Sequence, residues 1–284
     1  MQLTESRSPA NPITLAGAAW SWVGATIAES AAIYRALGIH AIDLIAIPGS
    51  RFDTYAIAAD PMGHARRLNK LDVAFSNLLV FFGSGFHDRP LNSSDAAVRS
   101  SNLQTFRLLL DFCAAARVYS ITVLPGVEQP PFGRQQSLEW TATELNRMNE
   151  LAKAAGVLLV YEPHVQSILE NPRDVLAFAS ENRDVKLVID YSHAVSLGFT
   201  SRDLDPLVEY AGHVHLRQAA FGHIQARWDD GAIVIPQLIG LLQQTGYQGY
   251  VTLEYEHDKF WNMDQCDVMT ETIKMRDVAL SCLA

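Results

Sequence analysis

The stretch "KLVIDYSH" (residues 186–193) begins as a buried strand and ends in charged groups. Its apolar run stops at Asp190, and His193 follows three residues later. Burying a carboxylate or an imidazole without a partner costs several kcal/mol, so such an ending needs an explanation. The endings of the other strands therefore decide how the chain is interpreted.

Strands and helices alternate on either side of this stretch. Apolar runs predict strands over residues 13–19, 41–47, 73–82, 120–125, 157–162, 186–190, 213–217 and 250–255. Apolar residues at helical spacing predict helices over residues 26–38, 95–118, 138–156, 172–180, 203–210, 236–245 and 267–283. This alternation indicates a parallel sheet with helices outside, and units of this number and length predict a single (β/α)8 TIM barrel.

A doubly wound open sheet is the structural alternative. Such a sheet usually has a glycine-rich phosphate turn after its first strand, whereas here that strand runs into "WSWVG" (residues 20–24), which has no GxGxxG pattern. No linker or change of composition divides the chain. We expect one barrel domain over residues 13–284, preceded by a loose polar segment over residues 1–12.

The composition is typical of a soluble globular protein with a substantial core. Of 284 residues, 49% are hydrophobic and 19% are charged, and the formal net charge is -9. A nucleic-acid binder usually carries a basic face, so the acidic balance disfavours nucleic acid as a partner. No apolar run is long enough for a membrane span, and residues 1–12 have no signal-peptide pattern. The three cysteines show no metal-ligand spacing or paired framework, which indicates a reduced, cytoplasmic protein.

The last four predicted strands all end in acidic or imidazole side chains. Glu162 ends strand five, Asp190 strand six and Glu254 strand eight, while His215 lies near the end of strand seven. Strands two to four end without histidine or glutamate. His213 is expected at the start of strand seven, so we assign it a structural role. In a barrel the C-terminal ends of the strands form one mouth, so these groups are expected to meet there.

Three clustered carboxylates repel one another, and a divalent cation neutralises them most easily. We therefore expect one divalent cation at the mouth. Three oxygen donors and one nitrogen, without a thiolate, suit Mn²⁺ best, with Mg²⁺ and Co²⁺ as alternatives. Zn²⁺ is a further alternative, although its structural sites prefer sulfur and nitrogen ligands.

Four motifs resemble the xylose isomerase-like TIM-barrel superfamily, which includes the sugar phosphate isomerase/epimerase family. They are "YEPH" (161–164), "IDYSH" (189–193), "HVHLRQA" (213–219) and "GYQGYVTLEYE" (246–256). The similarity extends from about residue 14 to residue 283.

The resemblance implies a set of site residues. The implied metal ligands are Glu162, Asp190, His215 and Glu254. The implied substrate contacts are His193 and Arg217, to which we add His164 of the first motif and Trp20 after strand one. Many relatives have Lys-Asp where this chain has Arg217 and Gln218. Relatives are often dimers or tetramers, so the resemblance also implies a homo-oligomer.

The expected activity is metal-dependent isomerisation or epimerisation of a keto-sugar or related polyol. Glu162 and Glu254 are the expected catalytic acid/base pair, which would remove and return the proton next to a carbonyl through an ene-diolate. Elimination begins with the same step, so a lyase or dehydratase of keto-inositols or 3-keto-glycosides is the alternative. An apurinic endonuclease would need further histidines on strands three and four, and a non-catalytic sugar-binding subunit is the remaining alternative.

Overall fold

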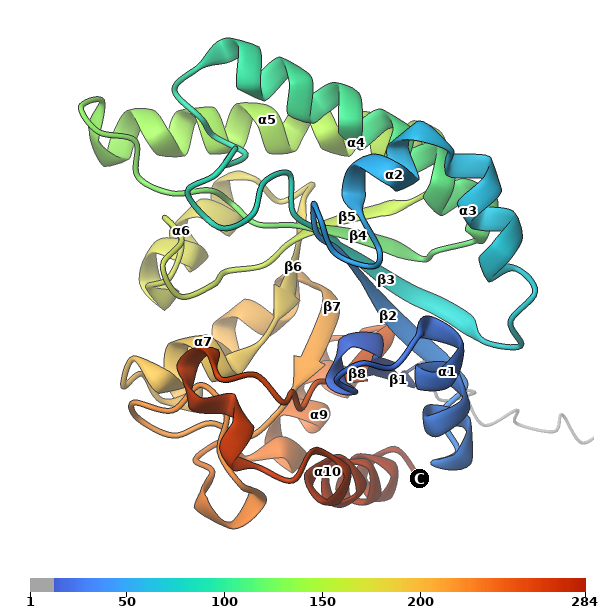
Figure 1. Ribbon diagram of the computed structural model, residues 1–284. Coiled ribbons are helices and arrows are strands. Elements are labelled where there is room, and N and C mark those ends of the chain that lie inside the picture. Colours follow the sequence, from blue (N-terminus) through green and yellow to red (C-terminus); the bar gives the residue numbers. More distant parts are fainter. Residues whose placement is uncertain (1–12) are drawn as a thin grey trace, which may run out of the picture.

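The computed structural model describes residues 13–284, which form a closed parallel barrel of eight strands surrounded by helices (Figure 1). The predicted loose segment, residues 1–12, lies outside the described residues. The strands are β1 (Thr14–Ala18), β2 (Ala41–Ala46), β3 (Ala74–Val80), β4 (Ser120–Val123), β5 (Leu158–Tyr161), β6 (Lys186–Ile189), β7 (Ala211–Leu216) and β8 (Tyr250–Leu253).

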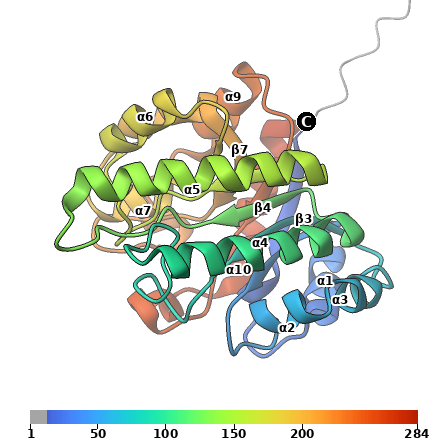
Figure 2. The same ribbon diagram turned by 90° about the horizontal axis from the view of Figure 1, so that it is seen from above.

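Within residues 13–284, ten α-helices connect or flank these strands. They are α1 (Ile27–Ala36), α2 (Thr54–Ala59), α3 (Pro61–Leu68), α4 (Ala96–Ala116), α5 (Gly133–Ala155), α6 (Pro172–Glu181), α7 (Tyr191–Ser196), α8 (Ser201–Leu204), α9 (Ile235–Gln244) and α10 (Val268–Leu283). Four short 3₁₀ helices lie in the loops: η1 (Ala19–Ser21), η2 (Asp205–Tyr210), η3 (Trp228–Asp230) and η4 (Phe260–Gln265). The two longest helices, α4 and α5, lie side by side outside β3, β4 and β5 (Figures 1 and 2).

Each strand pairs in parallel with the next strand in the sequence, and β1 pairs with β8 to close the barrel. The closing register places Leu15 opposite Val251 and Gly17 opposite Leu253. The sequence prediction of a single (β/α)8 barrel is therefore confirmed, and the open-sheet alternative is excluded.

The strands are mostly buried, because the helices cover their outer side while their inner side faces the barrel interior. Their buried residues are mainly apolar, with polar exceptions such as Asn77, Thr122 and Thr252. Gly17 shows how closely the outer layer packs. A Cβ atom at this position would lie 2.1 Å from Cε1 of Tyr34, a fully buried residue of α1. Only a glycine lets this helix approach β1 so closely.

The crossover between β2 and β3 contains two helices that were not predicted. Asp53 caps α2 by accepting a hydrogen bond from the backbone N–H of Ala56, and Asp60 caps α3 by accepting one from Gly63. Pro61 occupies the first position of α3, where a missing N–H is harmless. Short helices with strong caps lack the length that makes a periodic pattern visible in a sequence.

Three predicted boundaries were wrong in ways that affect the interpretation. The helix expected at 138–156 begins at Gly133, and the one expected at 203–210 is the short α8 followed by η2, with Pro206 near the start of η2. Strand β7 begins at Ala211 rather than at residue 213. His213 is therefore the third residue of β7, well inside the barrel.

No helix within residues 13–284 is both long and apolar enough to cross a membrane.

Candidate active site

The four predicted metal ligands lie together at the C-terminal ends of neighbouring strands. Glu162, Asp190 and Glu254 each follow directly on β5, β6 and β8, and His215 is the second-last residue of β7. All four side chains are buried. The barrel geometry alone brings them together, because adjacent parallel strands end at one rim.

His215 lies at the centre of this group. Its Nδ1 atom is 2.9 Å from Oε1 of Glu162 and 3.2 Å from Oε2 of Glu254. One donor atom each from Glu162, Asp190 and His215 lies within 4.8 Å of the others. Oxygen and nitrogen atoms that share a cation at about 2.1 Å are separated by about 3–4 Å. Donors this close to one another could hold a single divalent cation.

The charge of the cluster also fits a cation. Burial raises the pKa of Glu254, but Arg217 and His215 outweigh that effect and lower it to about 2. Among residues 13–284, Oε2 of Glu254 finds no hydrogen-bond partner, although it is buried. An ionised, buried oxygen needs a positive charge next to it, and Nη2 of Arg217 lies 3.7 Å away. Carboxylate and imidazole groups clustered in this way could also hold a divalent cation.

Burial also lowers the pKa of His215, yet the carboxylates of Glu254 and Glu162 raise it well above the usual value. These two carboxylates attract positive charge to Nδ1. A proton on this nitrogen would occupy the place that a cation would take.

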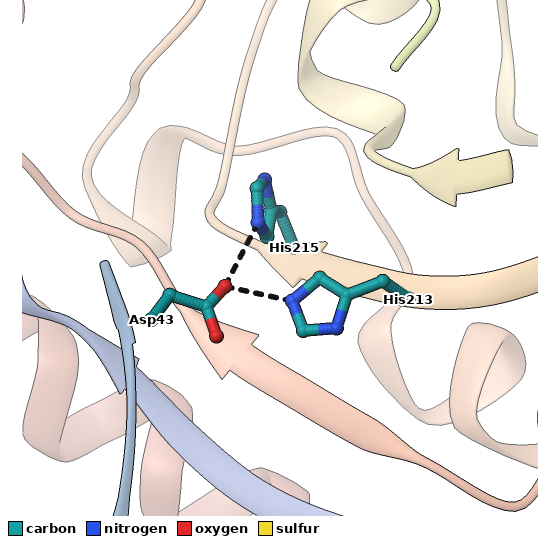
Figure 3. Close-up of side chains that lie close together, drawn as sticks. All are labelled: Asp43, His213 and His215. Carbon is teal, nitrogen blue, oxygen red and sulfur yellow. Dashed lines mark hydrogen bonds and ion pairs between the residues drawn. The ribbon is translucent and has the colours of Figure 1, made fainter. Parts of the chain in front are cut away.

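The second ring nitrogen of His215 points the other way, toward a residue that the sequence interpretation missed. Its Nε2 atom lies 3.1 Å from Oδ2 of Asp43, and Nε2 of His213 lies 2.7 Å from the same oxygen (Figure 3). Asp43 is the third residue of β2. The sequence signal for it is a carboxylate in the middle of the apolar run "AIDLIAI" (41–47), away from the end of the strand.

Arg217, a predicted substrate contact, is held by protein groups. Its Nε donates to Oγ of Ser192 at 2.8 Å, its Nη2 to Asp190 at 2.9 Å and its Nη1 to Glu256 at 3.0 Å. Nη2 also lies 3.7 Å from Glu254. The arginine therefore neutralises the acidic cluster, and it is buried while doing so.

Glu256 is a second residue that the sequence interpretation missed. It follows Glu254 by two positions, so in extended backbone the two side chains point to the same side. Burial and the neighbouring Glu254 raise the pKa of Glu256 to about 7. The motif "LEYE" (253–256) contained this signal.

The two predicted histidine contacts form a close pair with tilted rings beside the ligands. The rings of His164 and His193 are 3.8 Å apart between centroids, and Nε2 of His193 lies 3.4 Å from Oδ2 of Asp190. Burial lowers the pKa of His164 and lowers that of His193 well below the usual value. Both are therefore neutral imidazoles near pH 7, able to exchange hydrogen bonds with a hydroxyl group.

Aromatic side chains line the same mouth. The ring of Trp20 contacts that of His215 edge-on, with centroids 6.2 Å apart. Phe86 and Trp261 lie nearly parallel, with an interplanar angle of 24° and centroids 6.3 Å apart, and both contact His164. The structure thus brings every predicted site residue to one region, which also contains Phe86 and Trp261.

The sequence model of the xylose isomerase-like TIM barrel family matches residues 31–276. No curated protein is similar enough in sequence to match the chain.

Many solved structures share this fold. D-psicose 3-epimerase from Clostridium cellulolyticum H10, solved with D-tagatose, superimposes with a TM-score of 0.74 at 14% identity, covering 95% of this chain and 99% of its own. The IolI protein, in a structure with a zinc atom, gives a TM-score of 0.71 at 14% identity over 95% and 97% of the two chains. The 3-keto-D-glucoside 4-epimerase from E. coli gives a TM-score of 0.68 at 15% identity, covering 95% of this chain and 99% of its own. At these identities the likeness shows the fold.

Proposed function

Since the chain belongs to the xylose isomerase-like TIM barrel family, we propose that it is a metal-dependent sugar isomerase or epimerase. One observation carries the proposal. Glu162 and Glu254, from β5 and β8, approach the same nitrogen of His215 from separate strands, at 2.9 and 3.2 Å. Two carboxylates arranged in this way can reach a bound sugar from different sides.

The proposed cation ligands are the three carboxylates and one imidazole at the mouth: Glu162, Asp190, His215 and Glu254. Mn²⁺ is the first choice because the donors are mainly oxygen, and Mg²⁺, Co²⁺ and Zn²⁺ are alternatives. When bound, a divalent cation supplies Lewis acidity to the carbonyl and adjacent hydroxyl of the substrate, which makes the neighbouring proton more acidic.

The protein side chains carry the proton. One of Glu162 and Glu254 removes the proton from the carbon next to the carbonyl, and the other returns a proton. Return to the opposite face of the same carbon gives an epimer, whereas return to the neighbouring carbon gives an aldose–ketose isomerisation. His164 and His193, both neutral, hold hydroxyl groups of the substrate. Trp20 offers an apolar ring surface to the C–H face of the sugar.

The charges favour an uncharged sugar over a sugar phosphate. The mouth and the barrel interior beneath it together contain four carboxylates: Glu162, Asp190 and Glu254 at the strand ends, and Asp43 within β2. Within residues 13–284, Arg217 is the sole lysine or arginine paired with any of them. One arginine and one divalent cation leave an excess negative charge, before Glu256 is counted. A phosphate dianion would be repelled from such a site.

The names of the structural neighbours agree with this class. Two of those described above are epimerases, one acting on D-psicose and one on a 3-keto-D-glucoside. The second name also agrees with the alternative that the protein is a lyase of 3-keto-glycosides, because elimination begins with the same proton transfer as epimerisation. The endonuclease alternative has less support, since β3 and β4 are followed by Phe81 and Leu124 rather than by histidines.

A screen in D₂O tests the proposal. The purified protein, loaded with Mn²⁺, is incubated with unphosphorylated ketoses, keto-inositols and 3-keto-glycosides, and the reaction is followed by NMR. Deuterium at the carbon next to the carbonyl, with an epimer or isomer as product, supports the proposal. A product that lacks the β-oxygen identifies a lyase. Absence of exchange and of product across the panel contradicts the proposal.

A further inference from the structure

Asp43 is a buried charge at the centre of the barrel. It lies in the middle of β2, its side chain has no solvent exposure, and its flanking residues Ile42 and Leu44 are apolar. A carboxylate in such a place is tolerated only if donors surround it. Oδ1 accepts from Ser76, and Oδ2 faces both His213 and His215 (Figure 3).

The contact between Asp43 and His215 determines which ring nitrogen carries hydrogen. An ionised carboxylate can only accept, so Nε2 of His215, at 3.1 Å, must donate. The same ring then presents Nδ1 to Glu162 and Glu254, at 2.9 and 3.2 Å. A cation can bind only a ring nitrogen whose lone pair is free, and a hydrogen fixed on Nε2 leaves Nδ1 as that nitrogen.

His213 fixes the carboxylate in turn. Its Nε2 lies 2.7 Å from Oδ2 of Asp43, and the two imidazole rings stand at 89° with centroids 5.1 Å apart. His213 and His215 are two positions apart on β7, so their side chains point to the same side of the strand. Asp43, on a strand that is not a neighbour of β7, therefore receives two donors from one strand across the barrel interior.

The same three residues are close enough to be considered as a second metal site. Their geometry argues against that use. Both Nε2 atoms converge on a single oxygen at hydrogen-bond distance, and all three side chains are almost completely enclosed. A cation would have to break both hydrogen bonds and would find no free coordination position for a substrate.

We propose that Asp43 is a positioning residue that holds His215 in the orientation and tautomer required to bind the cation through Nδ1. This inference rests on the proposed cation site, but not on the reaction. Carboxylates that hydrogen-bond to a metal-binding histidine typically change metal affinity by about 10- to 100-fold when they are replaced.

The first test measures Mn²⁺ affinity of the metal-free protein by calorimetry. We expect Asp43→Asn to weaken binding by about 10- to 100-fold. Ser76→Ala is the matched control, because it removes a hydrogen bond from the same carboxylate and leaves the contact with His215 intact; we expect an affinity within about threefold of wild type. Circular dichroism establishes that both variants are folded. Unchanged affinity in folded Asp43→Asn overturns the inference.

The second test needs no substitution at Asp43, so it also serves if that variant does not fold. In the wild-type protein loaded with Zn²⁺ and labelled with ¹⁵N-histidine, we expect NMR to show hydrogen on Nε2 of His215 and none on Nδ1. The opposite tautomer would overturn the inference. If the wild-type protein binds no divalent cation, the proposed function fails; if it binds the cation and only the Asp43 results fail, the proposed function stands.

Discussion

Nη2 of Arg217 lies 2.9 Å from Oδ2 of Asp190, and both side chains are buried. Burial lowers the pKa of the arginine, but Glu254 and Asp190 outweigh this effect and raise it. The guanidinium is therefore the permanent positive charge of an otherwise acidic mouth. The pair differs in kind from the exposed ion pairs on the helices, such as the one between Lys153 and Glu150.

Replacing this arginine by an apolar residue of similar length should be costly. Removing one partner of a buried ion pair leaves the other charge uncompensated, which typically costs about 3–5 kcal/mol. We expect Arg217→Met to lower the free energy of unfolding of the metal-free protein by about that amount, measured by urea denaturation. Lys153→Met, at an exposed pair, should change it by less than about 1 kcal/mol. Equal effects of the two substitutions would show that the buried pair is not special.

Removing the cation should abolish turnover on the substrate found by the screen. After dialysis against EDTA we expect no measurable activity, and added Mn²⁺ or Co²⁺ should restore it, because the cation polarises the substrate carbonyl. His215→Ala should lose bound metal, measured by elemental analysis. His40→Ala is the control: this histidine is exposed and precedes β2, at the opposite end of the barrel, so metal content should not change. Full metal content in His215→Ala would refute the ligand assignment.

The two glutamates should be separable by isotope exchange. We expect Glu162→Gln and Glu254→Gln each to reduce turnover by about 10²- to 10⁴-fold, the usual contribution of a positioned base. If the reaction is an epimerisation, each variant should still exchange the proton of one epimer in D₂O while failing to interconvert the two. Metal content is measured in both variants, because loss of the cation would mimic loss of the base. Near wild-type turnover with the metal retained would exclude the paired-carboxylate mechanism.

Phosphorylation of the substrate should impair catalysis. For a free ketose and the corresponding ketose phosphate, we expect kcat/KM to differ by at least about tenfold in favour of the free sugar, which corresponds to about 1.4 kcal/mol. The reason is the excess of carboxylates over positive groups at the mouth and in the barrel interior beneath it. The ratio should shrink as ionic strength rises, because salt screens the repulsion. A preference for the phosphate would mean that a basic group enters the site from elsewhere.

Replacing two different glycines by alanine should change the stability of the protein in opposite directions. Gly17→Ala should destabilise the protein by about 1–3 kcal/mol or more, because the new methyl group meets the ring of Tyr34. Gly240→Ala, in the interior of α9 with no atom near the added Cβ, should stabilise it by about 0.5–1 kcal/mol through helix propensity. Thermal unfolding followed by circular dichroism provides the comparison. A stabilised Gly17→Ala variant would mean that α1 can move away from β1.

The barrel could be predicted because its signal is repeated eight times, so an error in one element does not change the topology. The ligands could be predicted for a related reason: Glu162, Asp190 and Glu254 each follow the last residue of a buried strand, and strand ends meet at one rim. At these positions the sequence pattern, an acidic residue after an apolar strand, corresponds directly to a place at the rim of the barrel.

Asp43 and Glu256 could not be assigned from the same signal. The role of Asp43 depends on its contacts with His213 and His215 across the barrel. These two histidines follow Asp43 in the sequence by 170 and 172 positions, respectively. Glu256 was not predicted as a site residue because Glu254, two positions earlier, already explained the acidic end of strand eight. Arg217 was expected to face the substrate, but its hydrogen bonds to Ser192, Asp190 and Glu256 became visible only when three separate segments were placed in space.

The position of Asp43 on β2 also has a consequence for recombining barrels of this kind. All four proposed cation ligands lie in the second half of the chain, on or just after β5 to β8, so this half looks like a transferable module. The hydrogen bonds of Asp43 cross from the first half to His213 and His215. A chimera that joins this second half to the first half of another barrel would keep all four ligands but lose the carboxylate that accepts these hydrogen bonds. The carboxylate would be kept only if the other barrel has an acidic residue at the position of Asp43 in its second strand.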